Sequence, residues 1–316
     1  MNYKEILNKI EECEKIDEIF NSLNLDFKLL YLKKNEKKLI INKIINDLIK
    51  NNKTLFFLNL ENNYLQNIDK LSESLKYNSS LKILYLSGNG IKNIDKLGEC
   101  LKYNNFLMDI NLEKNKIKNI DILSESLKFN SSLKYLNLSY NEIENIDKLS
   151  ESLKVNSFLD ILNLSDNKIE NIDKLSESLK YNNTLKNIYL FKNRIENIDD
   201  LAESLNNNST LTLLDLSGNE IKNIDKLSES LKINSSLKKL DLSYNKIKNI
   251  DVLSESLKFN SSLEILNLSD NKIENIDKLI ENLKFNNSLK KIYLKKNKIE
   301  NIDNLYKLDN RININD

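Results

Sequence analysis

Few residues in this chain could carry out chemistry. The sequence holds no histidine and only two cysteines, Cys13 and Cys100. Without histidine, the Ser-His-Asp and Cys-His arrangements of hydrolases and all histidine-bound metal sites are excluded. The four glycines form neither a phosphate-binding loop nor a dinucleotide-binding fingerprint. We therefore predict no catalytic residue, no metal site and no cofactor.

Acidic residues are plentiful, but they recur at a regular interval. Asp69 and Glu73 return in this way along the chain, which predicts a solvated helix face rather than an active site. Cys100 stands where equivalent segments have Ser74 or Ser126, so we interpret it as a substitution and not as a nucleophile. The sequence singles out no pair of carboxylates for hydrolysis.

The elements that would position any functional side chain come from a repeat of 26 residues. The pattern Leu-x-x-Leu-x-Leu-x-x-Asn occurs in ten copies, from residues 55–63 to residues 289–297, with isoleucine at some leucine positions. Each copy has about seven apolar positions that it cannot enclose alone. Stacked copies would therefore share one continuous core.

One repeat predicts a strand, a turn and a short helix. Leu84 and Leu86 are two residues apart, so on a strand they point to the same face. Asp95 would cap a helix that begins there, since its carboxylate suits a helix N-terminus. Leucines spaced four residues apart then mark one helix face. Asn104 falls where the helix ends and a left-handed residue is useful.

The asparagine that closes each pattern predicts a buried ladder. A carboxamide donates and accepts hydrogen bonds at once, whereas aspartate would bury a charge. The ladder residues are Asn63, Asn89, Asn115, Asn141, Asn167, Asn193, Asn219, Asn245, Asn271 and Asn297.

These features resemble leucine-rich repeat proteins, and the helix-bearing repeats are most similar to the ribonuclease-inhibitor-like class. The resemblance covers residues 55–314. It implies an α/β solenoid that forms a right-handed arc, with parallel strands on the concave face and short helices on the convex face.

Two regions follow from the register. We expect residues 1–54 to form a helical N-terminal cap that includes a degenerate repeat at 27–35. The alternative is that they form a small recruiting domain. Residues 55–316 predict ten repeats with a short polar C-terminal tail over 310–316. Because no separate cap closes the last repeat, we predict weak self-association through the C-terminal end.

Composition narrows the classes of partner. The net charge is +1, which argues against general nucleic-acid binding. No apolar run approaches the ~18 residues of a membrane span, and the polar N-terminus shows no signal peptide. We expect a cytoplasmic protein with a protein partner, and neither a nucleic-acid nor a membrane partner.

Variable strand positions are the candidate binding residues. Exposed aromatic side chains on a rigid sheet supply contact area at low entropic cost. The alternative is that strands favour aromatic residues in any case. The predicted concave patch consists of Tyr85, Tyr135, Tyr140, Tyr189 and Phe191.

Lysines crowd the last repeat. They could bind an acidic partner or phosphate, but protection of an exposed sheet edge is the interpretation that we favour. The lysines are Lys290, Lys291, Lys295, Lys296 and Lys298.

Together the sequence predicts a non-enzymatic protein-interaction module that binds a partner on its concave surface. The alternative is a regulator of a small GTPase, because a Ran GTPase activator has a similar class of repeat, although none of its motifs is present. An enzyme would need an added catalytic domain.

Overall fold

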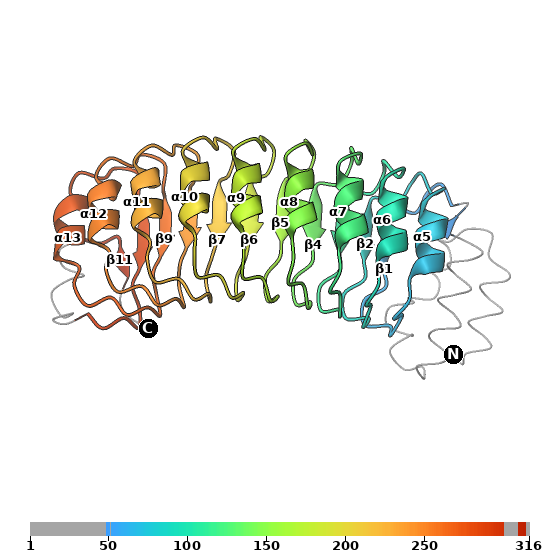
Figure 1. Ribbon diagram of the computed structural model, residues 1–316, viewed down its shortest axis with the longest axis horizontal. Coiled ribbons are helices and arrows are strands. Elements are labelled where there is room, and N and C mark those ends of the chain that lie inside the picture. The colour runs from blue at the N-terminus through green and yellow to red at the C-terminus, as the bar shows by residue number, and fades with distance from the viewer. Residues whose placement is uncertain (1–48, 51, 300–308, 314–316) are drawn as a thin grey trace. The chain divides into compact units, whose positions relative to one another are not determined.

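The structure is a computed structural model that describes residues 49–50, 52–299 and 309–313. The predicted cap over residues 1–54 therefore lies almost entirely outside the described residues. The chain divides into two compact units, residues 1–143 and residues 144–316. In Figure 1 the helices of each unit stand side by side, with the strands in a second row behind them.

Helices and strands alternate along the described chain. The first unit contains β1 (Phe57–Asn59), α5 (Asp69–Leu75), β2 (Ile83–Tyr85), α6 (Asp95–Leu101), β3 (Asp109–Asn111), α7 (Asp121–Leu127) and β4 (Tyr135–Asn137). The second contains α8 (Asp147–Leu153), β5 (Ile161–Asn163), α9 (Asp173–Leu179), β6 (Asn187–Tyr189), α10 (Asp199–Leu205), β7 (Leu213–Asp215), α11 (Asp225–Leu231), β8 (Lys239–Asp241), α12 (Asp251–Leu257), β9 (Ile265–Asn267), α13 (Asp277–Leu283), β10 (Lys291–Tyr293) and β11 (Ile312–Asn313).

Strands of successive repeats pair in parallel and in strict register. Leu58 of β1 lies opposite Leu84 of β2, 26 residues on, and the same offset continues through β4. In the second unit it continues from β5 to β10. This is the strand and helix alternation of a leucine-rich repeat solenoid, as the sequence predicted.

The core of each unit consists of the apolar repeat positions. In the repeat of β2, the side chains of Leu84, Leu86 and Ile91 are fully buried, and those of Ile94 and Leu97 are at most 1% exposed. Burying a side chain of this size stabilises a fold by roughly 1.5–3 kcal/mol. The same positions are buried in neighbouring repeats, so each repeat depends on its neighbours for its core.

The helix start differs from the sequence prediction. Asp95 is the first helical residue, and its side chain makes no capping hydrogen bond. Instead, Oδ1 of Asn93 accepts from the backbone N–H of Asp95 at 2.8 Å, and Nδ2 of Asn93 donates to the Asp95 carboxylate at 3.0 Å. The recurrent Asn-Ile-Asp triplet is therefore an asparagine turn that leads into a helix.

The predicted asparagine ladder is present in both units. Nδ2 of Asn219 donates to the carbonyls of Leu190 and Leu216, both at 3.0 Å, and its Oδ1 accepts from the N–H of Ile195 at 3.0 Å. Each such side chain satisfies backbone groups of its own repeat and of the preceding one. Nine of the ten ladder asparagines are buried, and Asn297 is half-buried.

A second asparagine ladder runs along the turn after each helix. Asn104 was expected to have a left-handed backbone, but it is absent from the residues with positive φ. Its Nδ2 donates to the carbonyls of Leu75 at 2.8 Å and Asn78 at 3.2 Å, which belong to the preceding repeat. Its Oδ1 accepts from the N–H groups of Phe106 and Leu107. The buried members are Asn78, Asn104, Asn130, Asn156, Asn182, Asn208, Asn234, Asn260 and Asn286.

The C-terminal end differs from the predicted polar tail, because residues 312–313 add strand β11. The backbone N–H groups of Ile292 and Leu294 donate to the carbonyls of Arg311 and Asn313, both at 2.9 Å. β10 is therefore paired on both sides over these residues. The predicted self-association needed an open end at β10, and β11 covers part of it.

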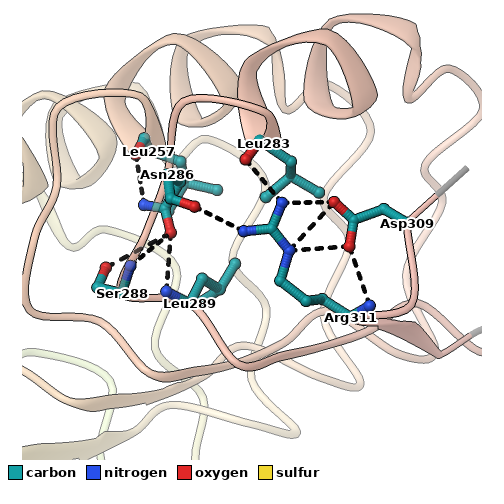
Figure 2. Close-up of polar contacts among 7 residues, drawn as sticks. All are labelled: Leu257, Leu283, Asn286, Ser288, Leu289, Asp309 and Arg311. Atoms are coloured by element: carbon teal, nitrogen blue, oxygen red, sulfur yellow. Dashed lines mark hydrogen bonds and ion pairs between the residues drawn. The ribbon is translucent and has the colours of Figure 1, made fainter.

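Arg311 ends the second asparagine ladder (Figure 2). Its two Nη atoms donate to the carbonyls of Leu283 and Asn286, both at 2.7 Å. A further repeat would place its turn asparagine on these same two carbonyls. Asp309 accepts from Nε of Arg311 at 2.8 Å and holds the guanidinium in place. This pairing lowers the pKa of Asp309.

Among the described residues no helix is both long enough and apolar enough to cross a bilayer.

Candidate interaction surface

The outward strand residues of the first unit form two rows. The first residues of the strands are Phe57, Ile83, Asp109 and Tyr135, and the third residues are Asn59, Tyr85, Asn111 and Asn137. The middle residue of every strand is buried and anchors the two rows to the core. Side chains that alternate across a strand explain this arrangement.

Aromatic rings and a carboxylate meet in the first unit. The rings of Phe57 and Tyr85 pack edge to face with centroids 5.2 Å apart. The pKa of Tyr85 is raised by burial, by the charges of Asp109 and Glu61, and by a hydrogen bond to Asp109. The pKa of Asp109 is also raised, mainly by burial. Oδ1 of Asp109 is buried and has no hydrogen-bond partner among the described residues.

Tyr135 and Tyr140 lie in the next repeat of the same unit. Tyr135 is opposite Asp109 in the register and is half-buried. Tyr140 is 41% exposed, has a φ of 53°, and has the Lys114 ammonium 5.3 Å from its ring centroid. Of the five predicted concave residues, Tyr85 and Tyr135 thus flank one carboxylate, and Tyr140 lies in the turn that follows β4.

Two acidic residues occupy neighbouring third strand positions in the second unit. Asp215 and Asp241 are opposite each other on β7 and β8. Burial raises the pKa of Asp215, and Asp241 adds to the increase, while hydrogen bonds from Ser217 oppose it. The pKa of neighbouring Tyr189 is raised mainly by burial, with a further contribution from the charge of Asp215.

Phe191 is less available than the sequence suggested. It is half-buried, and a Cβ added at Gly218 would lie 3.1 Å from its Cε2 atom. The ring therefore packs against the backbone of the next repeat. Tyr189 and Phe191 belong to the second unit, whereas Tyr85, Tyr135 and Tyr140 belong to the first.

The predicted basic patch is partly neutralised. Lys290 pairs with Glu264 at 2.5 Å, and Lys296 lies 3.9 Å from Asp270. Lys291 and Lys298 are exposed, and Lys295 is half-buried. Because β11 follows β10, these lysines do not mark the last strand, which removes part of the argument for edge protection.

Family models match several of the repeats. A model described as "Leucine Rich repeats (2 copies)" matches residues 235–284, and one described as "Leucine Rich repeat" matches residues 77–94, 129–146 and 207–224. This chain is a leucine-rich repeat protein. The search of curated proteins found no match.

Solved structures share the leucine-rich repeat fold at low identity. An internalin (inlF) from Listeria monocytogenes str. 4b F2365 is 18% identical with a TM-score of 0.51, and the match covers 90% of each chain. The APL1 leucine-rich repeat domain is 18% identical with a TM-score of 0.50, over 79% of this chain and 69% of that one. Internalin C2 (inlC2) of the same Listeria strain is 24% identical with a TM-score of 0.48, over 71% and 83%. The first two show the fold alone.

The chemistry available on this leucine-rich repeat protein is limited. The described residues contain no group of histidine, cysteine and acidic side chains that could hold a metal ion. Cys100 is buried, and burial raises the pKa of its thiol to about 12. A thiol with so high a pKa is a poor nucleophile at neutral pH.

Sequence reasoning missed a row of exposed apolar side chains just after the helices. Each follows the first residue beyond its helix, and each is 60–67% exposed. The signal in the sequence is the apolar residue at position x of the recurrent segment Leu-Lys-x-Asn. An apolar residue beside a helix is normally expected in the core, and its exposure becomes clear only when the end of the helix is known. The residues, called here the helix-end row, are Tyr77, Tyr103 and Phe129 in the first unit, and Val155, Tyr181, Ile233, Phe259 and Phe285 in the second.

Proposed function

We propose that this chain is a non-enzymatic protein-interaction module that holds a protein partner against its strand face. The family and the fold are typical of such modules. The observation that carries the proposal is the cluster of Phe57, Tyr85 and Asp109 on the first unit, where two packed rings adjoin a carboxylate. A ligand group could contact the exposed ring of Phe57 and the ring of Tyr85 beside it.

The cluster is well suited to binding because it is already ordered. Tyr85 is held by Phe57 on one side and by Asp109 on the other, so little side-chain entropy is lost when a partner arrives. Tyrosine and phenylalanine also bury large areas at interfaces. Since the carboxylate accepts hydrogen bonds and carries a charge, a partner lysine or arginine side chain complements the cluster.

Regulation of a small GTPase has no specific support from the described residues. An activating protein commonly supplies an arginine to the nucleotide site. The chain has two arginines. Arg194 lies 3.4 Å from Glu170, and Arg311 is held by Asp309 at the end of the ladder.

The repeat itself supplies variants that should fold. Asparagine already occupies the position of Tyr85 in five of the ten repeats, and it occupies the position of Tyr135 at Asn187. The test variant is therefore Tyr85→Asn with Tyr135→Asn. A matched control on the helix face is Lys70→Val with Lys148→Val, because Val252 holds the equivalent position in another repeat.

The experiment is affinity capture from a lysate with the native full-length chain, the strand-face variant and the helix-face control, after equal thermal stability has been shown. We expect a specific protein to be retained by the native chain and the control and to be lost, or reduced at least about tenfold, with the strand-face variant. Loss with the helix-face control alone would place the binding surface on the helices and contradict the proposal.

A further inference from the structure

We propose that the helix-end row is a docking surface for an anionic phospholipid membrane. This proposal is independent of the strand face. It differs from the expectation that the chain has no membrane partner, because that expectation considered only membrane-spanning segments. Its starting point is the exposure of large apolar side chains at one repeated position, since contiguous exposed apolar surface on a folded protein marks an interaction site.

The row is set by the repeat and not by chance. In the first unit, Tyr77, Tyr103 and Phe129 each follow the first residue beyond a helix, at intervals of 26 residues, and are 60%, 60% and 61% exposed. Successive repeats lie side by side, so these side chains form a line along one edge of the helix layer. A line of projecting side chains can contact a flat partner along its whole length, which a concave pocket on this protein could not do.

The chemistry of the row favours an apolar phase over a shaped ligand. In the second unit the same position holds Val155, Tyr181, Ile233, Phe259 and Phe285, and Asn207 is the one polar exception. Valine and isoleucine cannot stack on bases, so the row is poorly suited to single-stranded nucleic acid. Side chains that vary in shape but stay apolar fit the interfacial region of a bilayer, which accepts any of them.

Positive charge accompanies the row. Within the described residues of the first unit, Lys50, Lys76 and Lys102 form no ion pair, and they lie over aromatic rings instead. The Lys76 ammonium is 5.1 Å from the ring centroid of Tyr103, and the Lys102 ammonium is 4.8 Å from that of Phe129. Lysines of this kind extend towards lipid phosphates while the rings enter the interface.

A hollow between α5 and α6 opens beside these residues. Its volume is about 760 Å³, and five lysines and two glutamates are among its lining residues. One glutamate, Glu99, is already paired with Lys96 at 2.8 Å. The excess of lysine makes the hollow complementary to a negatively charged lipid headgroup, with Tyr77 and Tyr103 at its wall. Lysines that precede row residues pair with glutamates in both units, as Lys128 does with Glu125 and Lys154 with Glu177, both at 2.7 Å. The lysine-lined hollow belongs to the first unit, which is therefore the principal contact.

Substitutions that the repeat already contains provide the test. Asn207 occupies the row position in one repeat and Asn206 the lysine position before it. The apolar variant is Tyr77→Asn with Tyr103→Asn, and the charge variant is Lys76→Asn with Lys102→Asn. The matched control is Tyr64→Asn with Tyr244→Asn, which removes tyrosines that are 51% and 56% exposed in the turns that follow strands.

The assay is co-sedimentation of the full chain with phosphatidylcholine vesicles, with and without phosphatidylserine. We expect binding to the phosphatidylserine vesicles, weakened by salt. The apolar and charge variants should each bind about tenfold less, and the turn control should bind like the native chain. Equal binding by all variants, or no binding to the anionic vesicles, would overturn the proposal. Binding of poly-glutamate or an oligonucleotide through the same residues, without vesicle binding, would also overturn it and indicate a different class of partner.

Discussion

Replacing Arg311 with alanine should loosen the C-terminal repeat. The guanidinium satisfies the carbonyls of Leu283 and Asn286 and pairs with Asp309. The side chains of Arg311 and Asp309 are only 20% and 12% exposed. Two carbonyls left without a donor cost about 1 kcal/mol each, and an unpaired, mostly buried carboxylate adds a similar amount. We expect a total loss of roughly 2–4 kcal/mol.

The loss should be local, because each repeat of a solenoid contacts only its immediate neighbours. The amides of Ile292 and Leu294 donate to residues of the C-terminal strand, so they report on it directly. Hydrogen exchange of these two amides should accelerate in Arg311→Ala. The chain's other arginine provides the control, since Arg194 and Glu170 are 59% and 69% exposed and Arg194→Ala should cost less than ~1 kcal/mol.

Two further measurements test this prediction: the pH dependence of the stability loss, and a double variant that lacks both Arg311 and Asp309. Arg311 lowers the pKa of Asp309, so the stability of the pair is present above the unfolded pKa of aspartate and is lost as the pH falls through the folded value. The difference between native and Arg311→Ala should therefore shrink in acid. Removing Asp309 as well should recover part of the loss. Unchanged exchange at Ile292 and Leu294 in Arg311→Ala would refute the reasoning.

Three further predictions follow from buried groups. Asp215→Asn should stabilise the chain by about 0.5–1 kcal/mol at neutral pH, because a carboxylate opposite Asp241 is removed. Since the folded pKa of Asp215 is raised, that gain should vanish in urea titrations as the pH falls towards the unfolded value of ~3.9. Gly98→Ser should lower the melting temperature, because a Cβ there would lie 2.5 Å from the Leu123 nitrogen, and an unchanged value would contradict the close approach. Cys100 should react with a thiol reagent only after denaturant is added, and rapid labelling of the native chain would contradict its burial.

The sequence predicted the features that recur at one position of every repeat. The strand leucines and the short helices follow from local spacing, and the Asn63-type ladder follows from the demand that buried amides be satisfied. The second ladder was missed because Asn104 lies where a helix ends and was interpreted as a left-handed residue, whereas its amide bonds to Leu75 and Asn78, which are 29 and 26 residues away. Only the stacking of repeats brings those carbonyls within reach.

The helix start and the C-terminus show a similar limit. Asp95 and Asn93 are both suitable capping residues, and only the backbone direction decides that Asn93 accepts the hydrogen bond. The segment after residue 309 has too few apolar residues to predict a strand, yet Arg311 replaces an asparagine of the ladder and Ile312 is 5% exposed. A charged residue that performs the role of an amide leaves no pattern in the sequence.

Site residues were harder to predict than the fold. Exposure of an aromatic side chain depends on its neighbours, as the packing of Phe191 against Gly218 and of Tyr85 against Phe57 shows. The helix-end row lies just after the helices, outside the strand positions from which the binding residues were predicted.

The measurement that tests the central claim most directly is hydroxyl-radical footprinting of the native chain alone and in complex with its captured partner. If the strand face binds the partner, oxidation of Phe57, Tyr85 and Tyr135 should fall in the complex. Oxidation of Tyr181, in the helix-end row, should stay unchanged. Protection of Tyr181 with full oxidation of the three strand-face rings would contradict the account and place the partner on the other side of the repeats.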